Sequence, residues 1–265
     1  MGTVTSTDGT EIAFERTGSG PPLVLVHGGA CDHRFWDLSN IRSTFAEQYT
    51  VYPMDCRVVG KSDDAAEYEL EREFEDVAAV VDHLDESVTL LGHSSGALLS
   101  LEAALRINDL HKLVLYEPPI PVGNHELYSE EALAEMKRLL DEGKNEQVLV
   151  LFLREIAQST PEEIDAQRSA PDWQDLVGAA HVWPRSVQAV GEYEFDAARF
   201  ADLTTPTVLL TGSEGPPFLK DATERVNDVL PNSRIITFDG HAHEAMLTAP
   251  DRFIEEVLVF TLESN

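Results

Sequence analysis

The chain has 265 residues, 43% of them hydrophobic, which is enough for one large domain with a sizeable core. Its 48 acidic residues outnumber 19 basic ones, and the resulting net charge of −29 repels phosphate backbones and anionic lipid surfaces. The composition therefore argues against nucleic-acid and membrane partners, and the longest apolar run, Val148 to Leu153, is too short to cross a bilayer.

The acidic residues are spread along the whole chain and lysine is scarce. This pattern resembles proteins of salt-accumulating haloarchaea, in which concentrated salt screens the repulsion between acidic groups. An ordinary acidic mesophilic enzyme is the alternative. The segment from Met1 to Thr5 has neither a basic stretch nor an apolar core, so we expect no secretory signal and a cytoplasmic protein.

The first half of the chain alternates segments typical of strands and of helices. An Asp8-Gly9 turn precedes a strand-like segment at 10–17, and the fully apolar run 23–26 suits a parallel strand buried on both faces. Further strands are predicted at 50–54, 88–91 and 112–116, and helices at 35–48, 70–84 and 96–108. This alternation predicts an α/β fold with a parallel, doubly wound sheet.

The pattern changes after the strand at 112–116. The segment 118–199 is almost wholly helical, with acidic helices expected at 129–141 and 145–158. The strand pattern then returns, and the remaining elements are a strand at 207–211, a helix at 221–230, a strand at 234–238 and a helix at 250–262. A helical block between two strands of one sheet predicts a cap. We therefore expect a core formed by 1–117 and 200–265, with 118–199 as a helical cap insertion.

The segment Gly92-His93-Ser94-Ser95-Gly96 has the pattern G-x-S-x-G between a predicted strand and a predicted helix. A serine on such a turn is held in a strained conformation with its hydroxyl exposed, and its neighbours two residues away must be small. Gly92 and Gly96 meet that need. The pattern predicts Ser94 as a nucleophile.

A second motif, His27-Gly28-Gly29, follows the strand at 23–26. A loop without bulky side chains can offer a backbone N–H to a developing oxyanion. We expect the N–H of Gly29 to do so together with the N–H of Ser95, which lies at the positive end of the following helix. His27 is expected to shape this loop rather than to transfer protons.

A third motif, Gly240-His241-Ala242-His243, lies between the last predicted strand and the helix at 250–262. This loop leaves a sheet at the same edge as the serine turn, as the loop carrying a general base must. The position of the loop alone does not decide between His241 and His243.

Together these motifs resemble the α/β-hydrolase family. The run 23–29 is similar to the family's oxyanion strand and loop, 55–62 to its D-x-R-G-x-G-x-S segment, and 92–96 to its nucleophile elbow. The segment 239–243, with Pro250 seven residues on, is similar to its histidine loop, and that register selects His243 as the base. The resemblance implies a mostly parallel, eight-stranded sheet with helices on both faces and a helical lid.

The chain departs from the family pattern in two places. Val58 replaces a usual glycine, which we expect to alter a loop rather than the chemistry. Many members carry the acid of the triad three residues after a glycine that ends a strand. In this chain that glycine is Gly212, the third residue after it is Gly215, and Glu214 lies one position early. Other members place the acid after the preceding strand of the sheet. That strand is predicted here at 112–116, and Glu117 follows it.

We favour Glu117 as the acid and keep Glu214 as the alternative. Pro118 biases Glu117 toward an extended conformation that would fix its carboxylate near the strand end. Glu214 lies in a looser turn, a poorer place for a group that must orient an imidazole.

The expected function is that of a serine hydrolase that cleaves a small carboxylic ester, lactone or thioester through an acyl-enzyme on Ser94. The alternatives are a cofactor-free peroxidase or C–C hydrolase on the same site, or a ligand-binding switch protein that keeps the triad. We expect no metal and no organic cofactor, a small-molecule substrate, and a monomer or small homo-oligomer. The aromatic residues expected to select the substrate are Phe35, Trp36 and Trp183, with Tyr128, Phe152, Trp173 and Phe218 as further candidates.

Overall fold

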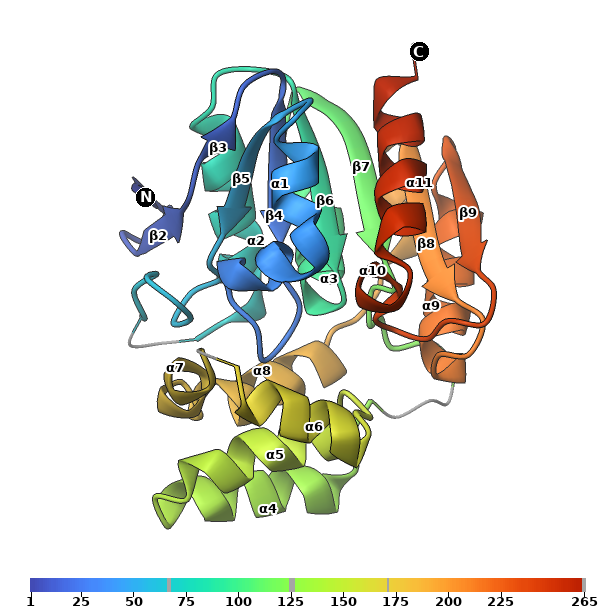
Figure 1. Cartoon of the computed structure of the whole chain (residues 1–265). Coiled ribbons are helices and arrows are strands. Elements are labelled where there is room, and N and C mark those ends of the chain that lie inside the picture. The colour runs from blue at the N-terminus through green and yellow to red at the C-terminus, as the bar shows by residue number, and fades with distance from the viewer. Residues whose placement is uncertain (66–67, 124–126, 171, 264–265) are drawn as a thin grey trace.

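The computed structural model describes residues 1–65, 68–123, 127–170 and 172–263, without the side chains at 162, 163 and 166. Its centre is one sheet with the strand order β1-β2-β5-β4-β6-β7-β8-β9, and a short β3 pairs with β5 (Figure 1). The strands are β1 Gly2–Thr5, β2 Glu11–Phe14, β3 Thr17–Gly18, β4 Pro22–Val26, β5 Thr50–Met54, β6 Val88–His93, β7 Leu110–Tyr116, β8 Thr207–Gly212 and β9 Ser233–Phe238. The strands from β4 onward pair in parallel, whereas β1, β2 and β3 pair antiparallel.

Helices cover both faces of this sheet (Figure 1). They are η1 His33–Asn40, α1 Ile41–Phe45, α2 Leu70–Asp82, α3 Ser95–Ala103, η2 Ala197–Phe200, α9 Pro217–Val229, α10 Ala245–Thr248 and α11 Pro250–Leu262. One apolar cluster packs α2, α3 and α9 on one face, and a second packs α1 and α11 on the other. Burial on both faces explains why β4, β6 and β8 are buried at every position.

Between β7 and β8 the chain forms helices and, over the described part of this segment, no strand. The helices are α4 Glu130–Asp141, α5 Asn145–Glu155, α6 Pro161–Arg168, α7 Trp173–Gly178 and α8 Val182–Gly191. They gather beyond the carboxyl ends of the strands (Figure 1), around an apolar cluster that also contains Ala30 and Val59 from the loops after β4 and β5. We call these five helices the cap helices.

Ion pairs between described residues join the cap helices to the rest of the chain. Arg185 of α8 contacts Asp64 at 2.7 Å, and Asp175 of α7 contacts Arg34 at 2.8 Å. None of the helices in the described ranges is long and apolar enough to cross a bilayer.

The parallel register brings the loops with the predicted motifs to one edge of the sheet. Val26 at the end of β4 lies opposite Gly92 of β6, and His93 at the end of β6 lies opposite Tyr116 of β7. Tyr116 in turn lies opposite Leu210 of β8. The residues that follow these strands therefore emerge side by side beneath the cap helices.

The main error in the predicted elements is the helix at 35–48. The chain there forms η1 and the short α1, because Ser39 and Asn40 adopt left-handed φ angles of 52° and 60° that interrupt the helix. Helix α9 begins at Pro217 rather than at 221, with its proline in the first turn, where the missing N–H costs no hydrogen bond.

Candidate active site

Ser94 occupies a strained turn between β6 and α3, with φ 53° and ψ −125°. The turn is tight enough to require both flanking glycines. A Cβ at Gly92 would lie 2.3 Å from the carbonyl oxygen of Gly96, and a Cβ at Gly96 would lie 2.3 Å from that of His27. The local geometry is thus that of a nucleophile elbow.

Gly29 and Ser95 line the same cavity as Ser94. The loop that carries Gly29 is braced by the buried ring of His27, whose Nε2 accepts a 3.1 Å hydrogen bond from the N–H of Cys56. Nδ1 therefore carries the proton and donates to the carbonyl oxygen of Gly28 at 2.7 Å. Burial lowers the pKa of His27, so the ring is a neutral brace of the loop.

His243 and Glu117 form a hydrogen-bonded pair at the edge of this cavity. The Nδ1–H of His243 donates to Oε2 of Glu117 at 2.5 Å, which leaves Nε2 as the basic nitrogen. Glu117 is completely buried, and its Oε1 accepts hydrogen bonds from the hydroxyl of Thr211 at 2.7 Å and the N–H of Gly212 at 2.8 Å. Burial opposes ionisation of His243, but the hydrogen bond and charge of Glu117 outweigh it and raise the pKa of the imidazole.

The conformation of Glu117 differs from the one the sequence suggested. Its φ is +46°, in the left-handed region, not the extended conformation that Pro118 favours. Its N–H still pairs with the carbonyl oxygen of Leu210, at 3.1 Å. The three hydrogen bonds to its carboxylate, rather than the following proline, hold the group in place.

The alternatives for the acid and the base lie elsewhere. Glu214 is exposed and accepts a hydrogen bond from Ser213 at 2.9 Å. The ring of His241 is bonded to the hydroxyl of Thr248 at 2.9 Å. The structure brings Glu117 to His243 and does not bring Glu214 there.

His93, the second residue of the elbow motif, contributes to the site although the motif alone gives it no role. Its buried ring stacks on Phe35 with centroids 5.2 Å apart, and its Nε2 lies 3.3 Å from the carbonyl oxygen of His243. Burial lowers the pKa of His93 well below its usual value, so the ring is a neutral donor to that carbonyl. On the other side, Tyr116 donates its hydroxyl to the carbonyl oxygen of Ala242 at 2.8 Å. These two contacts hold the loop of the histidine.

The cavity has a volume of about 90 Å³, and Ser94 and His243 both line it. Its apolar wall comes from the cap helices and from α9, and includes Phe152 and Phe218. Both are among the aromatic residues suggested by the sequence.

The three aromatic residues preferred from the sequence are not in this wall. Trp36 is completely buried in the core, and Phe35 packs between Trp36 and His93. Trp183 lines another cavity, of about 30 Å³, together with His27, Gly28 and Gly29. All three are buried, as large aromatic side chains usually are.

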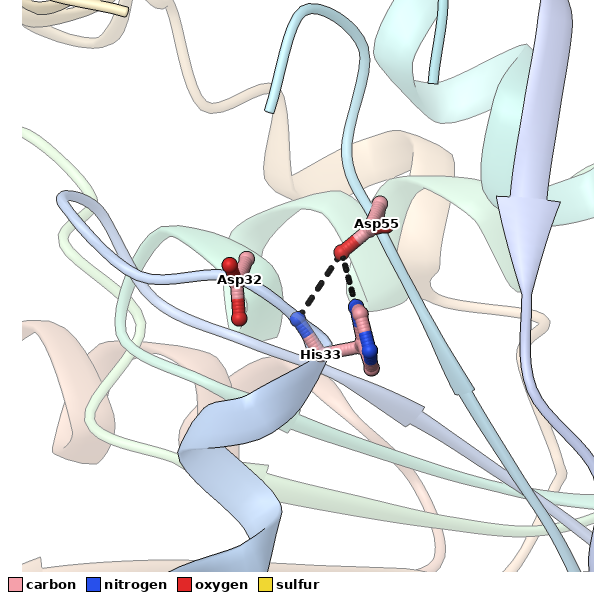
Figure 2. A group of neighbouring side chains, drawn as sticks. All are labelled: Asp32, His33 and Asp55. Carbon is pink, nitrogen blue, oxygen red and sulfur yellow. Dashed lines mark hydrogen bonds and ion pairs between the residues drawn. The ribbon is translucent and has the colours of Figure 1, made fainter. Parts of the chain in front are cut away.

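A second cluster of titratable groups consists of Asp32, His33 and Asp55 (Figure 2). One ligand atom from each falls within 4.8 Å of the others, so the three residues could in principle hold a cation. Asp55, however, already accepts hydrogen bonds from Nδ1 of His33 at 2.7 Å and from the N–H of Lys61 at 2.9 Å. Asp32 is held by Arg34, whose Nε donates at 2.9 Å. A cation would have to replace these contacts, and the arrangement fits an internal hydrogen-bond network better.

Comparison with known proteins defines the class of this fold and site. The family model described as "Alpha/beta hydrolase family" matches residues 23–256. The chain therefore belongs to the alpha/beta hydrolase family.

Several individual proteins are similar over nearly the whole chain. The crystal structure of an alpha/beta hydrolase from Sphaerobacter thermophilus matches with a TM-score of 0.83 and 33% identity, covering 98% of this chain and 99% of the other. A non-heme chloroperoxidase of Streptomyces lividans is 26% identical, covering 98% of this chain and 99% of its own length. A pimeloyl-[acyl-carrier protein] methyl ester esterase of Aeromonas hydrophila is 27% identical, over 92% of this chain and 96% of its own length. The similar proteins thus share the family and differ in reaction.

Proposed function

We propose that this protein hydrolyses small carboxylic esters through an acyl-enzyme on Ser94, with His243 as general base and Glu117 as the acid that orients it. Lactones and thioesters are acyl donors of the same kind. The observation that carries the proposal is the His243–Glu117 hydrogen bond at the wall of a cavity that Ser94 also lines. The esterase relative and the fold agree with it.

The first half of the reaction forms the acyl-enzyme. Nε2 of His243 takes the proton of Ser94 as the serine oxygen attacks the ester carbonyl. The N–H groups of Gly29 and Ser95 stabilise the resulting oxyanion, Ser95 being the first residue of α3, where the helix dipole is positive. The carbon–oxygen bond to the alcohol then breaks, and His243 returns the proton to the leaving oxygen.

The second half releases the acid. His243 takes a proton from water, whose oxygen attacks the acyl carbon, and the bond to Ser94 breaks as the serine regains its proton. Glu117 stabilises the imidazolium in both halves, and its hydrogen bonds from Thr211 and Gly212 keep its carboxylate fixed while it does so.

The size of the cavity supports a small substrate. Its volume of about 90 Å³ lies below the roughly 300–1,000 Å³ of pockets for drug-sized ligands. A short acyl group therefore fits this arrangement of the cap helices.

The net charge of −29 supports two further parts of the proposal. We assign the enzyme to the cytoplasm of a salt-accumulating organism, and we assign it no nucleic-acid or membrane partner. A melting temperature that rises with molar salt would support the first assignment, and an unchanged one would contradict it.

Hydrolysis of 4-nitrophenyl acetate tests the central part of the proposal. The wild type should turn the ester over, and Ser94→Ala should lose this activity while remaining folded. Ser43→Ala, which removes an exposed hydroxyl on α1, is the matched control and should match the wild type. Equal activity of Ser94→Ala and the wild type would refute the assignment.

A further inference from the structure

Two cavities share part of their walls around Gly29. The active-site cavity has a volume of about 90 Å³, and the second cavity, which Trp183 lines, has a volume of about 30 Å³. The described residues that border both cavities are Gly29, Ser95, Ser186 and Val190. None of these side chains is larger than that of valine. In a close-packed interior, a bulkier group must therefore fill the space that keeps the two cavities apart.

Phe152 of α5 is the bulky group at this boundary. Its ring lines the active-site cavity and ends against Gly29, where a Cβ would lie 2.9 Å from Cζ of the ring. The ring also packs against that of Trp183, with the two centroids 5.8 Å apart and the ring planes inclined at 44°. Among the described wall residues, Phe152 belongs to the first cavity and Trp183 to the second. The pair of rings therefore stands between the cavities.

The surroundings of Phe152 leave its ring little room to move aside. The residue is buried in the apolar cluster of the cap helices, together with Leu149 and Val187. The ring also fits against Gly29 only because that residue has no Cβ. A substrate chain that reached the ring would have to push it into packed side chains, and overfilling a packed interior is costly.

The second cavity suits an alkyl chain, should the ring be removed. Apolar side chains in its wall include those of Val59, Leu99 and Val182. The charged residues of its described wall already have partners. Nε of Arg57 donates to the carboxylate of Asp76 at 2.7 Å, and the carboxyl group of Glu73 accepts a hydrogen bond from the hydroxyl of Tyr68 at 2.5 Å. An uncharged chain that entered this cavity would therefore break none of these contacts.

We propose that Phe152 is a specificity-determining residue that limits this site to short acyl groups, because its ring closes the active-site cavity against the second one. This inference rests on the proposed ester hydrolysis at Ser94 and names the class of substrate: esters whose alkyl chain ends before the ring of Phe152. Removal of the ring joins the two cavities and admits longer alkyl chains.

The 4-nitrophenyl esters of acetic, butanoic, hexanoic and octanoic acid test the inference, because only the acyl chain changes along the series. In the wild type, kcat/KM should fall from butanoate to octanoate. Phe152→Ala should raise the kcat/KM ratio of octanoate to butanoate at least about tenfold, since a single methylene group in a pocket changes discrimination by about 10- to 200-fold. Phe152→Leu keeps more of the packing and should raise the ratio by a smaller factor.

The matched control is Leu153→Ala, which shortens the next buried side chain of α5 in the same apolar cluster but outside the described walls of both cavities. It should leave the ratio unchanged. Adding Leu99→Phe to Phe152→Ala fills the second cavity from α3 and should reverse the gain for octanoate. Equal kcat/KM for the four esters in the wild type, equal ratios in the Phe152 variants and Leu153→Ala, or a gain that Leu99→Phe leaves intact would overturn the inference.

Calorimetric binding of methyl butanoate and methyl octanoate to Ser94→Ala, with and without Phe152→Ala, separates this inference from the proposed function. If hydrolysis depends on Ser94 but Phe152→Ala has the chain-length profile of Leu153→Ala, the function stands and the role of Phe152 fails. If no ester is hydrolysed but Phe152→Ala strengthens the binding of methyl octanoate relative to methyl butanoate, the role of Phe152 stands without the function.

Discussion

Two histidine–carboxylate pairs lie at the same edge of the sheet and have very different surroundings. In one pair His243 donates from Nδ1 to Glu117 at 2.5 Å, and in the other His33 donates from Nδ1 to Asp55 at 2.7 Å. Both carboxylates are completely buried, and in both pairs the carboxylate raises the pKa of the histidine against the opposing effect of burial.

The difference between the pairs lies in what the second ring nitrogen faces. Nε2 of His33 lies 3.6 Å from the carboxylate of Glu15, so the ring is held between two acids. His243 lines a cavity together with a strained serine. A histidine–carboxylate pair is therefore not by itself a sign of catalysis. It becomes a candidate relay only where the second nitrogen is free to take a proton from a reacting group.

The largest expected effect is on kcat, and it should differ between variants of the two pairs. Glu117→Gln should lower kcat for ester hydrolysis about 10³- to 10⁴-fold, because an amide can neither fix the tautomer of His243 nor stabilise its charge. Asp55→Asn should lower kcat less than tenfold. Steady-state kinetics on folded protein, verified by circular dichroism, measures both. Similar losses in the two variants would mean that the distinction between the pairs is wrong.

The Asp55–His33 pair should matter for the stability of the fold. Asp55→Asn should lower the free energy of unfolding by about 3 kcal/mol, because the buried carboxylate joins the N–H and ring of His33 to the N–H of Lys61. Urea unfolding of the wild type and the variant gives the difference. A loss below about 1 kcal/mol would show that the pair contributes little to the fold.

The raised pKa of His33 predicts a pH-dependent contribution to stability. A histidine with a raised folded pKa stabilises the fold fully below its ordinary value of 6.5, and this contribution is lost as the pH rises through the folded pKa. The stability difference between wild type and His33→Gln should therefore shrink as the pH is raised from 5.5 to 9. A difference that grows over this range would contradict the assigned sign.

The pKa of His243 is also raised, and this affects the pH dependence of kcat/KM. The imidazole must be neutral to accept the proton of Ser94, so kcat/KM should rise with pH through a pKa above 6.5. In Glu117→Gln this limb should move to lower pH. A limb that stays in place would show that Glu117 does not control the ionisation of the base.

The smallest expected effect concerns the loop that surrounds Asp55. Val58 has a φ of +74°, which is costly for a β-branched residue. Val58→Gly should raise the free energy of unfolding by about 0.5–1 kcal/mol, the relief of strain being reduced by the greater freedom of glycine in the unfolded chain. Val58→Ala, which keeps a Cβ, is the control and should not stabilise the protein in urea titrations.

Much of this arrangement could be predicted from the sequence. Apolar runs bounded by glycine and proline indicated the buried strands, and the parallel order brought Ser94, Gly29 and the histidine loop to one edge. The helix predicted at 35–48 failed because residues 39 and 40 leave the helical region, which apolar periodicity does not reveal.

The carboxylate partner of His243 was harder to predict than the positions of Ser94 and His243. Its identity depends on which carboxylate reaches His243 across neighbouring strands. Glu117 does so, but not in the extended conformation that Pro118 favours. Phe35, Trp36 and Trp183 do not line the cavity, because sequence position does not tell which ring faces it. The motif at 55–62 includes Asp55, but its pairing with His33 depends on how the fold brings the two residues together (Figure 2).

Labelling with a fluorophosphonate probe, followed by intact-protein mass spectrometry, tests the central claim most directly. The wild type should gain one adduct, Ser94→Ala none, Glu117→Gln one at a rate at least 100-fold lower, and Asp55→Asn one at a rate within tenfold of the wild type. Labelling of folded Ser94→Ala, or equal rates for Glu117→Gln and the wild type, would contradict the assignment of Ser94 as a nucleophile activated by the His243–Glu117 pair.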